Sequence, residues 1–399
     1  MKKSSILAIL GLSGFVVMAD NWVVSPILPS IAAGIGVDPV RAGLLITAYM
    51  IPFGVFQLVF GPLADRFGKR QVITVAMIAF TIGTGLSALG ATLTGLALYR
   101  ALTGVFAASV MPISLALIGD LFPMEERQGA IGTFMGVSFL GQGLSMAIGG
   151  TIAYLVSWRG VFATYAGLSV IATTLLLSIG SRIPSQRNPQ SRMIAPFVGL
   201  LKNRASVLTY VVVLLEGILI LGSFSYLGAY IARNYHFDNL VIGLIMTAFG
   251  VMAVLGGRLS GRLAARLGRR SVLTAGLLLA CAADAVVFFA GGALPAFVAG
   301  VGLLGIGFML AHSTLLTIAT EFASKARGMA MSLVAFAFMG GGGIGTAIGG
   351  RLITTGGFSQ LYGAYSLALA VLVVLALIVV RDVGSADMKT VPSAAGKEV

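Results

Sequence analysis

Charged residues and cysteine are both scarce in this sequence. Of its 399 residues, 10% are charged and one is cysteine, whereas 58% are hydrophobic and the mean hydropathy is +1.01. The single Cys281 excludes an internal disulfide framework and offers no metal-ligand spacing, so we expect no bound metal. A composition this apolar lies far outside the usage of soluble globular domains and indicates a protein that crosses a membrane many times.

The patterns of common soluble enzymes are missing as well. The glycines at 340–343 do not form a phosphate-binding loop, because they lie in an apolar stretch and no Gly-Lys-Ser or Gly-Lys-Thr follows them. The sequence also shows no metal-ligand cluster and no Ser-His-Asp set. We therefore expect no enzymatic activity, no cofactor and no coupling to ATP.

Long apolar stretches dominate what is present. Because about 20 residues cross the hydrocarbon core, these stretches can be counted as transmembrane helices. The sequence predicts an all-α integral membrane protein with twelve spans. The expected spans are roughly residues 5–31, 42–64, 71–90, 93–121, 129–156, 161–179, 206–232, 240–264, 271–291, 295–320, 328–353 and 358–380.

The chain contains an internal repeat. The sequence GPLADRFGKRQV at 61–72 returns as GRLAARLGRRSV at 261–272, an offset of 200 residues, and Arg127 likewise matches Arg327. This offset predicts two six-helix bundles that are parallel repeats. The expected domains are a bundle at 1–180, a polar linker at 181–204, a second bundle at 205–381 and a disordered tail at 382–399.

Basic residues predict the orientation in the membrane. Most of the 26 Lys and Arg residues fall in loops on one side of the predicted spans, and short loops rich in these residues face the cytoplasm. We expect a multi-pass protein of the cell membrane with both termini and the linker in the cytoplasm. The net charge of +13 then reflects loops that face anionic lipid headgroups, and it does not indicate a nucleic-acid partner.

Several motifs resemble those of a known family. The sequences GPLADRFGKR at 61–70 and GDLFPMEERQGAIG at 119–132, with Arg100, Gly104 and Trp158-Arg159, resemble the major facilitator superfamily, and more narrowly its twelve-helix drug:proton antiporters. The resemblance extends over the whole chain. It implies the major facilitator fold, in which two pseudo-symmetric bundles rock about a midplane site. It also implies that a proton gradient supplies the energy.

The loop between the second and third spans is the expected gate. Its candidate residues are Gly61, Asp65, Arg66, Gly68 and Arg70. The glycines permit close helix approach and a tight turn, and the arginines hold the loop in the cytoplasm. The resemblance implies that Asp65 latches this side against the eleventh span, whereas the second repeat has Ala265 at that position. The alternative is a basic loop that only sets the topology.

Asp20 and Arg100 are the first pair of ionisable residues inside predicted spans. Each such residue costs about 2.5–3.5 kcal/mol at a helix centre, so a function or a partner is expected for it. Counting about 1.5 Å per residue from the span ends puts Asp20 and Arg100 at the same depth. The resemblance places both helices at the central cavity. We expect the two side chains to pair, with Asp20 carrying a proton and Arg100 tuning it, against the alternative of a static packing pair.

Three further ionisable residues lie inside spans. Glu216 is expected near the midplane as a second proton site or a carboxylate for cations, with a simple interhelical hydrogen bond as the alternative. Asp284 is expected to be structural, because the ninth span is peripheral in the resembled fold. His312 could titrate near physiological pH or could be a packed histidine.

A substrate pocket can be predicted from polar-tipped and aromatic residues on the cavity helices. Such residues suit apolar or cationic compounds through adaptable packing and cation–π contacts, although most aromatic residues in spans serve helix packing. The candidates are Asn21, Trp22, Tyr49, Phe53, Gln57, Met111, Ser223, Tyr226, Tyr230, Phe249, Phe308, Met309 and His312.

These observations predict a monomeric, proton-coupled exporter of small amphipathic or cationic compounds. One feature departs from the resembled exporters: they place a Gly-Pro pair on the fifth helix where this chain has Ser145-Met146. A proton symporter or facilitator for a small metabolite such as a sugar is therefore an alternative. A sensor or scaffold of the same fold, without transport, is the other.

Overall fold

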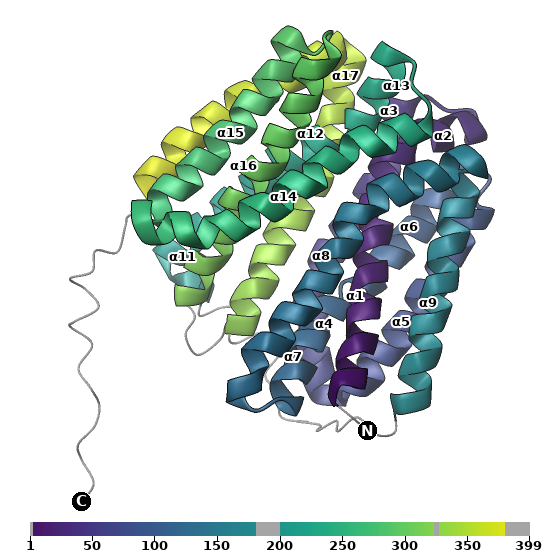
Figure 1. Ribbon diagram of the computed structural model, residues 1–399, viewed down its shortest axis with the longest axis vertical. Coiled ribbons are helices and arrows are strands. Elements are labelled where there is room, and N and C mark those ends of the chain that lie inside the picture. Colours follow the sequence, from purple (N-terminus) through teal and green to yellow (C-terminus); the bar gives the residue numbers. More distant parts are fainter. Residues whose placement is uncertain (1–2, 181–199, 323–326, 380–399) are drawn as a thin grey trace, which may run out of the picture.

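A computed structural model describes residues 3–180, 200–322 and 327–379, which are almost entirely helical (Figure 1). The first half of the chain contains α1 (Lys3–Trp22), α2 (Val24–Ile35), α3 (Pro39–Ala42), α4 (Leu44–Phe67), α5 (Lys69–Leu89), α6 (Leu93–Ala107), α7 (Val110–Leu121), α8 (Met124–Leu155) and α9 (Trp158–Gly180). The second half contains α11 (Arg204–Glu216), the π-helix η1 (Gly217–Leu221), α12 (Gly222–Ser225), α13 (Leu227–Tyr235), α14 (Asn239–Leu267), α15 (Arg269–Ala290), α16 (Leu294–Phe322) and α17 (Arg327–Val379).

These helices confirm the predicted all-α membrane architecture. In the described part of the chain, 11 helical segments are long and apolar enough to cross a membrane, and the last of them, residues 329–378, has 50 residues. That segment holds the predicted eleventh and twelfth spans, because α17 leaves helical geometry at Gly356 and at Gly357, where φ is +72°. Twelve crossings result.

The structure divides several of the predicted spans. The first span is broken between α1 and α2, the second at Gly43, the fourth between α6 and α7, and the seventh into α11, η1, α12 and α13. The prediction from hydropathy treated each span as one continuous helix and did not include these breaks. The predicted boundaries also shift by a few residues; α8, for example, begins at Met124, before the expected residue 129.

Short loop residues fix where the helices begin and turn. Asp38 accepts a hydrogen bond from the amide of Val40 at 2.7 Å, and Asp238 accepts one from Val241 at 3.0 Å, so both act as N-caps. The two copies of the repeated motif turn at Gly68 (φ +100°) and Gly268 (φ +81°). These values favour glycine, as expected for the tight turn predicted at Gly68.

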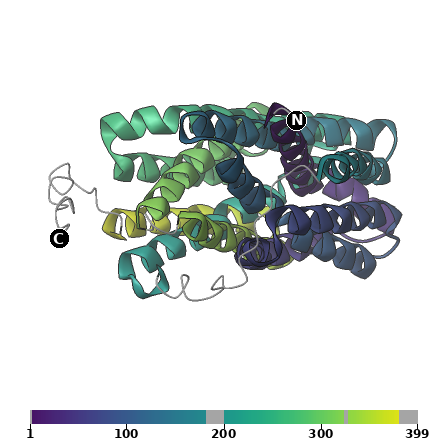
Figure 2. The ribbon, with the colours of Figure 1, turned by 90° about the horizontal axis from the view of Figure 1, so that it is seen from below.

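The helices form two groups that lie side by side (Figures 1 and 2). Helices α1 to α9 pack on one another, as do α11 to α17, and the groups meet through α4 with α17, α8 with α14, and α2 with α13. We call these groups the first and second bundles. Residues 181–199 of the predicted linker, the whole predicted tail and the last two residues of the predicted second bundle, 380–381, lie outside the described residues, while 200–202 form a helical turn before α11.

The two bundles converge at one end of the molecule. The end with the start of α1 and the ends of α4 and α7 is called the terminus side, and the end with α3 and α13 is called the distal side. On the distal side, the Ser25 hydroxyl donates to the carbonyl oxygens of Phe224 and Ser225 at 2.9 and 3.0 Å. Towards the terminus side the bundles diverge, as Figure 1 shows.

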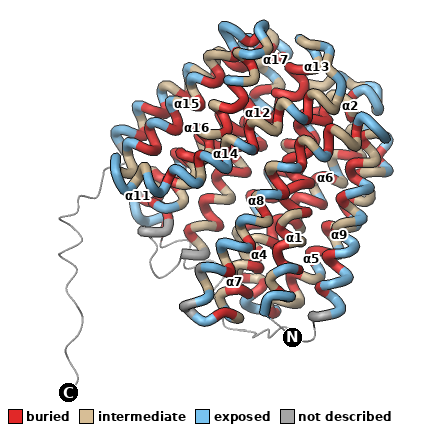
Figure 3. The backbone as a smooth tube through the Cα atoms, in the orientation of Figure 1, coloured by how far each residue is buried: buried red, intermediate tan, exposed pale blue. Residues whose placement is uncertain are grey.

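Glycines allow the backbones of the two bundles to touch. A Cβ atom added at Gly54 would lie 2.8 Å from the amide nitrogen of Gly340, and one added at Gly250 would lie 2.9 Å from the Cα of Gly143. Small residues of this kind let membrane helices approach closely. Buried residues therefore continue from each bundle across the interface between them (Figure 3).

Candidate functional site

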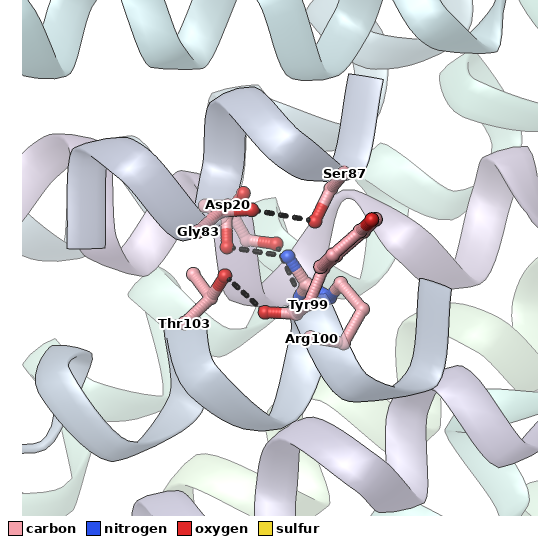
Figure 4. A network of polar contacts seen from close by, with 6 residues as sticks. All are labelled: Asp20, Gly83, Ser87, Tyr99, Arg100 and Thr103. Atoms are coloured by element: carbon pink, nitrogen blue, oxygen red, sulfur yellow. Dashed lines mark hydrogen bonds and ion pairs between the residues drawn. The ribbon is translucent and has the colours of Figure 1, made fainter. Parts of the chain in front are cut away.

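The side chains of Asp20 on α1 and Arg100 on α6 form a buried ion pair (Figure 4). Arg100 Nη1 donates to Asp20 Oδ2 at 2.6 Å, and Arg100 Nη2 donates to the carbonyl oxygen of Asp20 at 3.1 Å. The two side chains are 0% and 1% exposed. The predicted pairing is thus confirmed, and its charge-assisted hydrogen bond lies out of contact with solvent.

Aromatic rings surround the guanidinium group of Arg100. Its central carbon lies 4.3 Å from the ring centroid of Tyr49 and 5.5 Å from that of Phe162. Such contacts favour a cation over the face of a ring. A Cβ atom at Gly104 would collide with the carbonyl oxygen of Tyr49, so the glycine allows α6 to lie against α4 and brings Tyr49 over Arg100.

The ion pair leaves polar atoms without partners. Among the described residues, Asp20 Oδ1, Arg100 Nε and the hydroxyls of Tyr49 and Tyr165 are buried and have no hydrogen-bond partner. The nearby hydroxyls of Ser87 and Thr103 bond to carbonyl groups of their own helices instead, as Figure 4 shows. Asp20 therefore keeps one carboxylate oxygen that can accept a proton or a hydrogen bond.

A pair of a buried glutamate and a histidine lies in the second bundle. Glu216 Oε2 lies 3.1 Å from His312 Nδ1, and Glu216 is 0% exposed while the His312 side chain is 15% exposed. Glu216 Oε1 has no hydrogen-bond partner among the described residues. Glu216 is the last residue of α11 and directly precedes η1, and π-helical turns occur frequently at functional sites. The sequence predicted both residues as candidates but not that they are partners.

A series of aromatic rings leads from Trp22, which is close to Asp20 in sequence, to His312 of the second pair. Trp22, two residues after Asp20, has its ring centroid 5.6 Å from that of Phe249, which lies 5.7 Å from Phe308. Phe308 lies 5.4 Å from His312. The rings thus extend from α1 of the first bundle through α14 and α16 of the second. Four of these residues, including His312, were predicted to contact substrate, and the structure brings them together.

The space between the bundles at this level is nearly closed. A cavity of about 10 Å³ is lined by Asn21, Trp22, Ser25, Ile46, Met50, Phe224 and Ser225. This volume is that of about one water molecule. A larger pocket of about 320 Å³ lies within the second bundle towards the terminus side, and neither pair lines it. It is lined by Ser260, Gly261, Ala264, Ala265, Arg269, Ser313, Thr314 and Thr317.

The structure does not bring every predicted contact residue to the central cavity. Ser223 donates instead to Asp284 at 2.5 Å, and the Tyr226 hydroxyl donates to the Thr346 carbonyl at 2.9 Å. Tyr230 stacks on Phe297 within the second bundle at 4.9 Å.

The remaining predicted contact residues lie along α4, α7 and α16. Phe53 stacks on Tyr49 at 5.7 Å, and Gln57 is buried one turn further along α4. Met111 and Met309 are half-buried against the core. All four are kept as predictions of substrate contact.

The predicted gate lies on the terminus side. Asp65 and Arg66 are exposed at the end of α4, next to Gly68, and Arg70 lies in the first turn of α5. Lys69 and Asp120 are the charged neighbours of Asp65, and its latch against the eleventh span is still a prediction. The loop is bound by Lys69, whose ammonium lies 2.6 Å from Asp120 of α7.

Gly61 is the gate residue whose expected role is not seen here. We expected it to permit close helix approach, but a Cβ atom added there would meet nothing within 4 Å.

Asp284 is buried and contacts the seventh span, although the ninth span was expected to be peripheral. It is 1% exposed and accepts a hydrogen bond from Ser223 of α12, which belongs to the seventh span. Its Oδ2 atom has no hydrogen-bond partner in the described part of the chain. A break in the seventh span at Tyr226 accompanies this contact.

The sequence matches a known protein family. The sequence profile of the Major Facilitator Superfamily matches residues 10–231 and 214–397. The uncharacterized MFS-type transporter YceJ of Bacillus subtilis (strain 168) is 27% identical over 378 residues, which cover 91% of this chain and 92% of YceJ.

Two other similarities are partial or structural. The puromycin resistance protein pur8 of Streptomyces alboniger is 36% identical over 143 residues, 36% of this chain and 28% of its own length. The nucleoside transporter NupG superposes with a TM-score of 0.76 over 94% of this chain and 99% of NupG, at 14% identity. This last similarity shows the fold alone.

Proposed function

The chain belongs to the major facilitator superfamily, and from this membership we propose that it exports small amphipathic or cationic compounds in exchange for protons. The observation that carries the proposal is the fully buried pair of Asp20 and Arg100, in which Asp20 Oδ1 has no hydrogen-bond partner among the described residues. Ionisable residues inside a membrane span are costly, so a function is expected for them. The partial similarity to a puromycin resistance protein supports export of a drug-like compound.

We place both termini in the cytoplasm of a cell with the protein in its plasma or inner membrane. The basic loops at the turns marked by Gly68 and Gly268 support this orientation. The terminus side is then cytoplasmic, and the structure is the inward-facing state, closed on the distal side. The small central cavity indicates that rocking of the bundles must widen the site before a compound can bind.

Asp20 carries the transported proton in this proposal. A proton added to its carboxylate, for which Oδ1 is free, removes the charge that Arg100 Nη1 contacts at 2.6 Å. Arg100 remains held by the carbonyl oxygen of Asp20 and by the face of Tyr49. Loss of the carboxylate charge weakens the hold on Arg100 Nη1, which can then contact a substrate or water, and this couples protonation to binding.

Glu216 assists as a second proton site or as the carboxylate that attracts cationic substrates. Its partner His312 lies at the end of the aromatic series that starts at Trp22. A cation placed along these rings would gain both the carboxylate and cation–π contacts. A single chain contains both pairs, so we propose that the monomer is the working unit.

Reconstituted liposomes with an internal pH dye test this function. We expect cationic and neutral drugs to evoke proton flux under an imposed gradient, and we expect the flux to be abolished in Asp20→Asn. Glu216→Gln should narrow the range of cationic substrates. Glu126→Gln, which changes an exposed carboxylate, is the matched control and should behave as wild type. Transport by Asp20→Asn with unchanged dependence on the proton gradient would exclude Asp20 as the coupling group.

A facilitator or symporter of a small metabolite is the second candidate. The observation that favours it is α8, which runs as one helix from Met124 to Leu155 with Ser145-Met146 where related exporters have a Gly-Pro pair. The carbonyl of Met146 lies against Gly243 at the interface between the bundles. Counterflow without net proton movement in the same liposomes would favour this candidate over export.

A further inference from the structure

Asp284 is a buried carboxyl group that the proposed cycle does not use. It lies on α15 about 9 Å from the distal end of that helix, counting about 1.5 Å per residue to Ala290. Its Oδ1 accepts the Ser223 hydroxyl at 2.5 Å, while its Oδ2 and the hydroxyl of Tyr362 are buried without hydrogen-bond partners among the described residues. Two unsatisfied polar atoms in one place indicate a site that is completed by something small.

Among the residues that the structure describes, no Lys or Arg side chain pairs with Asp284. Tyr362 and Tyr365 face it from α17, and Tyr230 lies next to Tyr362 from α13. The ionisable side chains described on α14 and α16 lie nearer the terminus side than Asp284 does. They are His312, which pairs with Glu216, and Arg258, Arg262 and Arg266. On α15 itself, Cys281 bonds to Ser366, and Arg269 and Arg270 lie at the terminus end.

Asp284 is also connected to the contact that closes the distal side. Ser223, its hydrogen-bond donor, directly precedes Phe224 and Ser225, whose carbonyl oxygens accept from Ser25 of the first bundle. Tyr226 breaks the helix there with φ −106° and ψ 2°. A change at Asp284 therefore acts on the turn of the seventh span that touches the first span.

We propose that Asp284 binds a proton and that its protonation stabilises the closed distal side. When the distal side is closed, the carboxylate would be a buried charge without a counter-charge, which is strongly unfavourable. Separation of the bundles admits water to the turn at Ser223 and lets the group ionise. A proton that favours one state over the other shifts the equilibrium between them.

This inference rests on the alternating access of the proposed function but on neither Asp20 nor the identity of the substrate. The sign follows from the geometry: low pH favours the closed distal side and high pH favours its opening. A proton taken up from the distal side would therefore promote the transition to the state described here.

Spin labels on the distal side test the proposal in the full-length protein in lipid nanodiscs. Arg41 on α3 and Arg351 on α17 are exposed and belong to opposite bundles, and Val40 lies against Gly350 between them. Both would be changed to Cys in a Cys281→Ala background. We expect the fraction with a long distance between the labels to rise several-fold from pH 5 to pH 9.

Variants of Asp284 decide the outcome. In Asp284→Asn the distance should stay short at every pH, whereas Glu126→Gln and Asp20→Asn should keep the wild-type profile, the latter even if its transport is lost. A pH profile of Asp284→Asn that matches wild type would overturn the proposal, as would a distance change driven by sodium at constant pH. If the Asn variant does not fold, Asp284→Glu must move the pH midpoint, and an unchanged midpoint would also overturn it.

Discussion

The two bundles share a scaffold but not a polar site. The repeated motif turns at Gly68 in one and at Gly268 in the other with similar backbone angles. The first bundle holds its ion pair between α1 and α6, whereas the second holds an acid–histidine pair between α11 and α16 and a separate carboxyl on α15. The two bundles thus turn at corresponding glycines, whereas their buried ionisable groups differ.

The offset of 200 residues makes this contrast specific. Asp20 corresponds to Ile220 and Arg100 to Gly300, while Asp284 corresponds to Thr84. No buried ionisable residue of one bundle has an ionisable counterpart in the other among these positions. A substitution at one of them therefore alters one bundle only, which allows the contribution of each half to be measured separately.

Of the substitutions that change one bundle only, replacement of Arg100 should have the largest effect on stability and transport. Arg100→Met leaves Asp20 buried without its partner, and breaking a buried pair in this way costs about 3–5 kcal/mol. We expect a marked fall in the thermal unfolding temperature in detergent and no transport. The double variant Asp20→Asn with Arg100→Met should regain most of the stability, because both charges are then gone, but it should remain inactive.

If Arg100→Met were as stable as wild type, the pair would contribute nothing to the first bundle, and the contrast between the bundles would lie in function alone. Glu126→Gln, which alters an exposed carboxylate near Lys3, serves as the control for nonspecific loss of charge.

Overpacking the interface between the bundles should have the next largest effect. In Gly150→Val the new Cβ atom would collide with the carbonyl of Asn239 and lie 2.9 Å from the Cα of Gly243. Overpacking of this kind costs about 1–3 kcal/mol, which shifts the balance towards an open distal side by roughly five- to 150-fold. Transport rates in liposomes and the distance between distal spin labels measure the shift.

A matched control exists on the same helix. A Cβ atom at Gly136 of α8 would meet nothing within 4 Å, so Gly136→Val changes the same helix by the same side chain without touching the second bundle. Equal losses of transport in the two variants would mean that α8 itself, and not its contact with α14, is sensitive.

Much of the fold follows from the sequence because its determinants are linear. Twelve apolar stretches and an offset of 200 residues are visible without any contact being known. The pairing of Asp20 with Arg100 could be predicted because a count of residues gave both side chains the same depth and the resemblance placed both helices at the central cavity. The latch at Asp65 and the proton roles of Asp20 and Glu216 are still predictions.

The second bundle was harder to predict because its contacts depend on rotation about helix axes. The partner of Glu216 is His312 of α16, 96 residues away. Ser223 donates to Asp284 of α15, 61 residues away. A count of residues gives the depth of a side chain but not the direction in which it points, so sequence reasoning placed Ser223 at the cavity and Asp284 at the periphery.

The smallest effect is expected at the repeated loop on the terminus side. Lys69 of the first copy lies 2.6 Å from Asp120, whose side chain is 50% exposed, and the position corresponding to Asp120 in the second copy is Thr320. An ion pair this exposed contributes about 0.2–1 kcal/mol and is weakened by salt. Lys69→Ala should therefore lower the unfolding temperature slightly at low salt and not at all at high salt. Loss of transport at unchanged stability would instead show that the first copy of the loop acts as a gate. The second copy, which has Ala265 at the position of Asp65, would then lack this role.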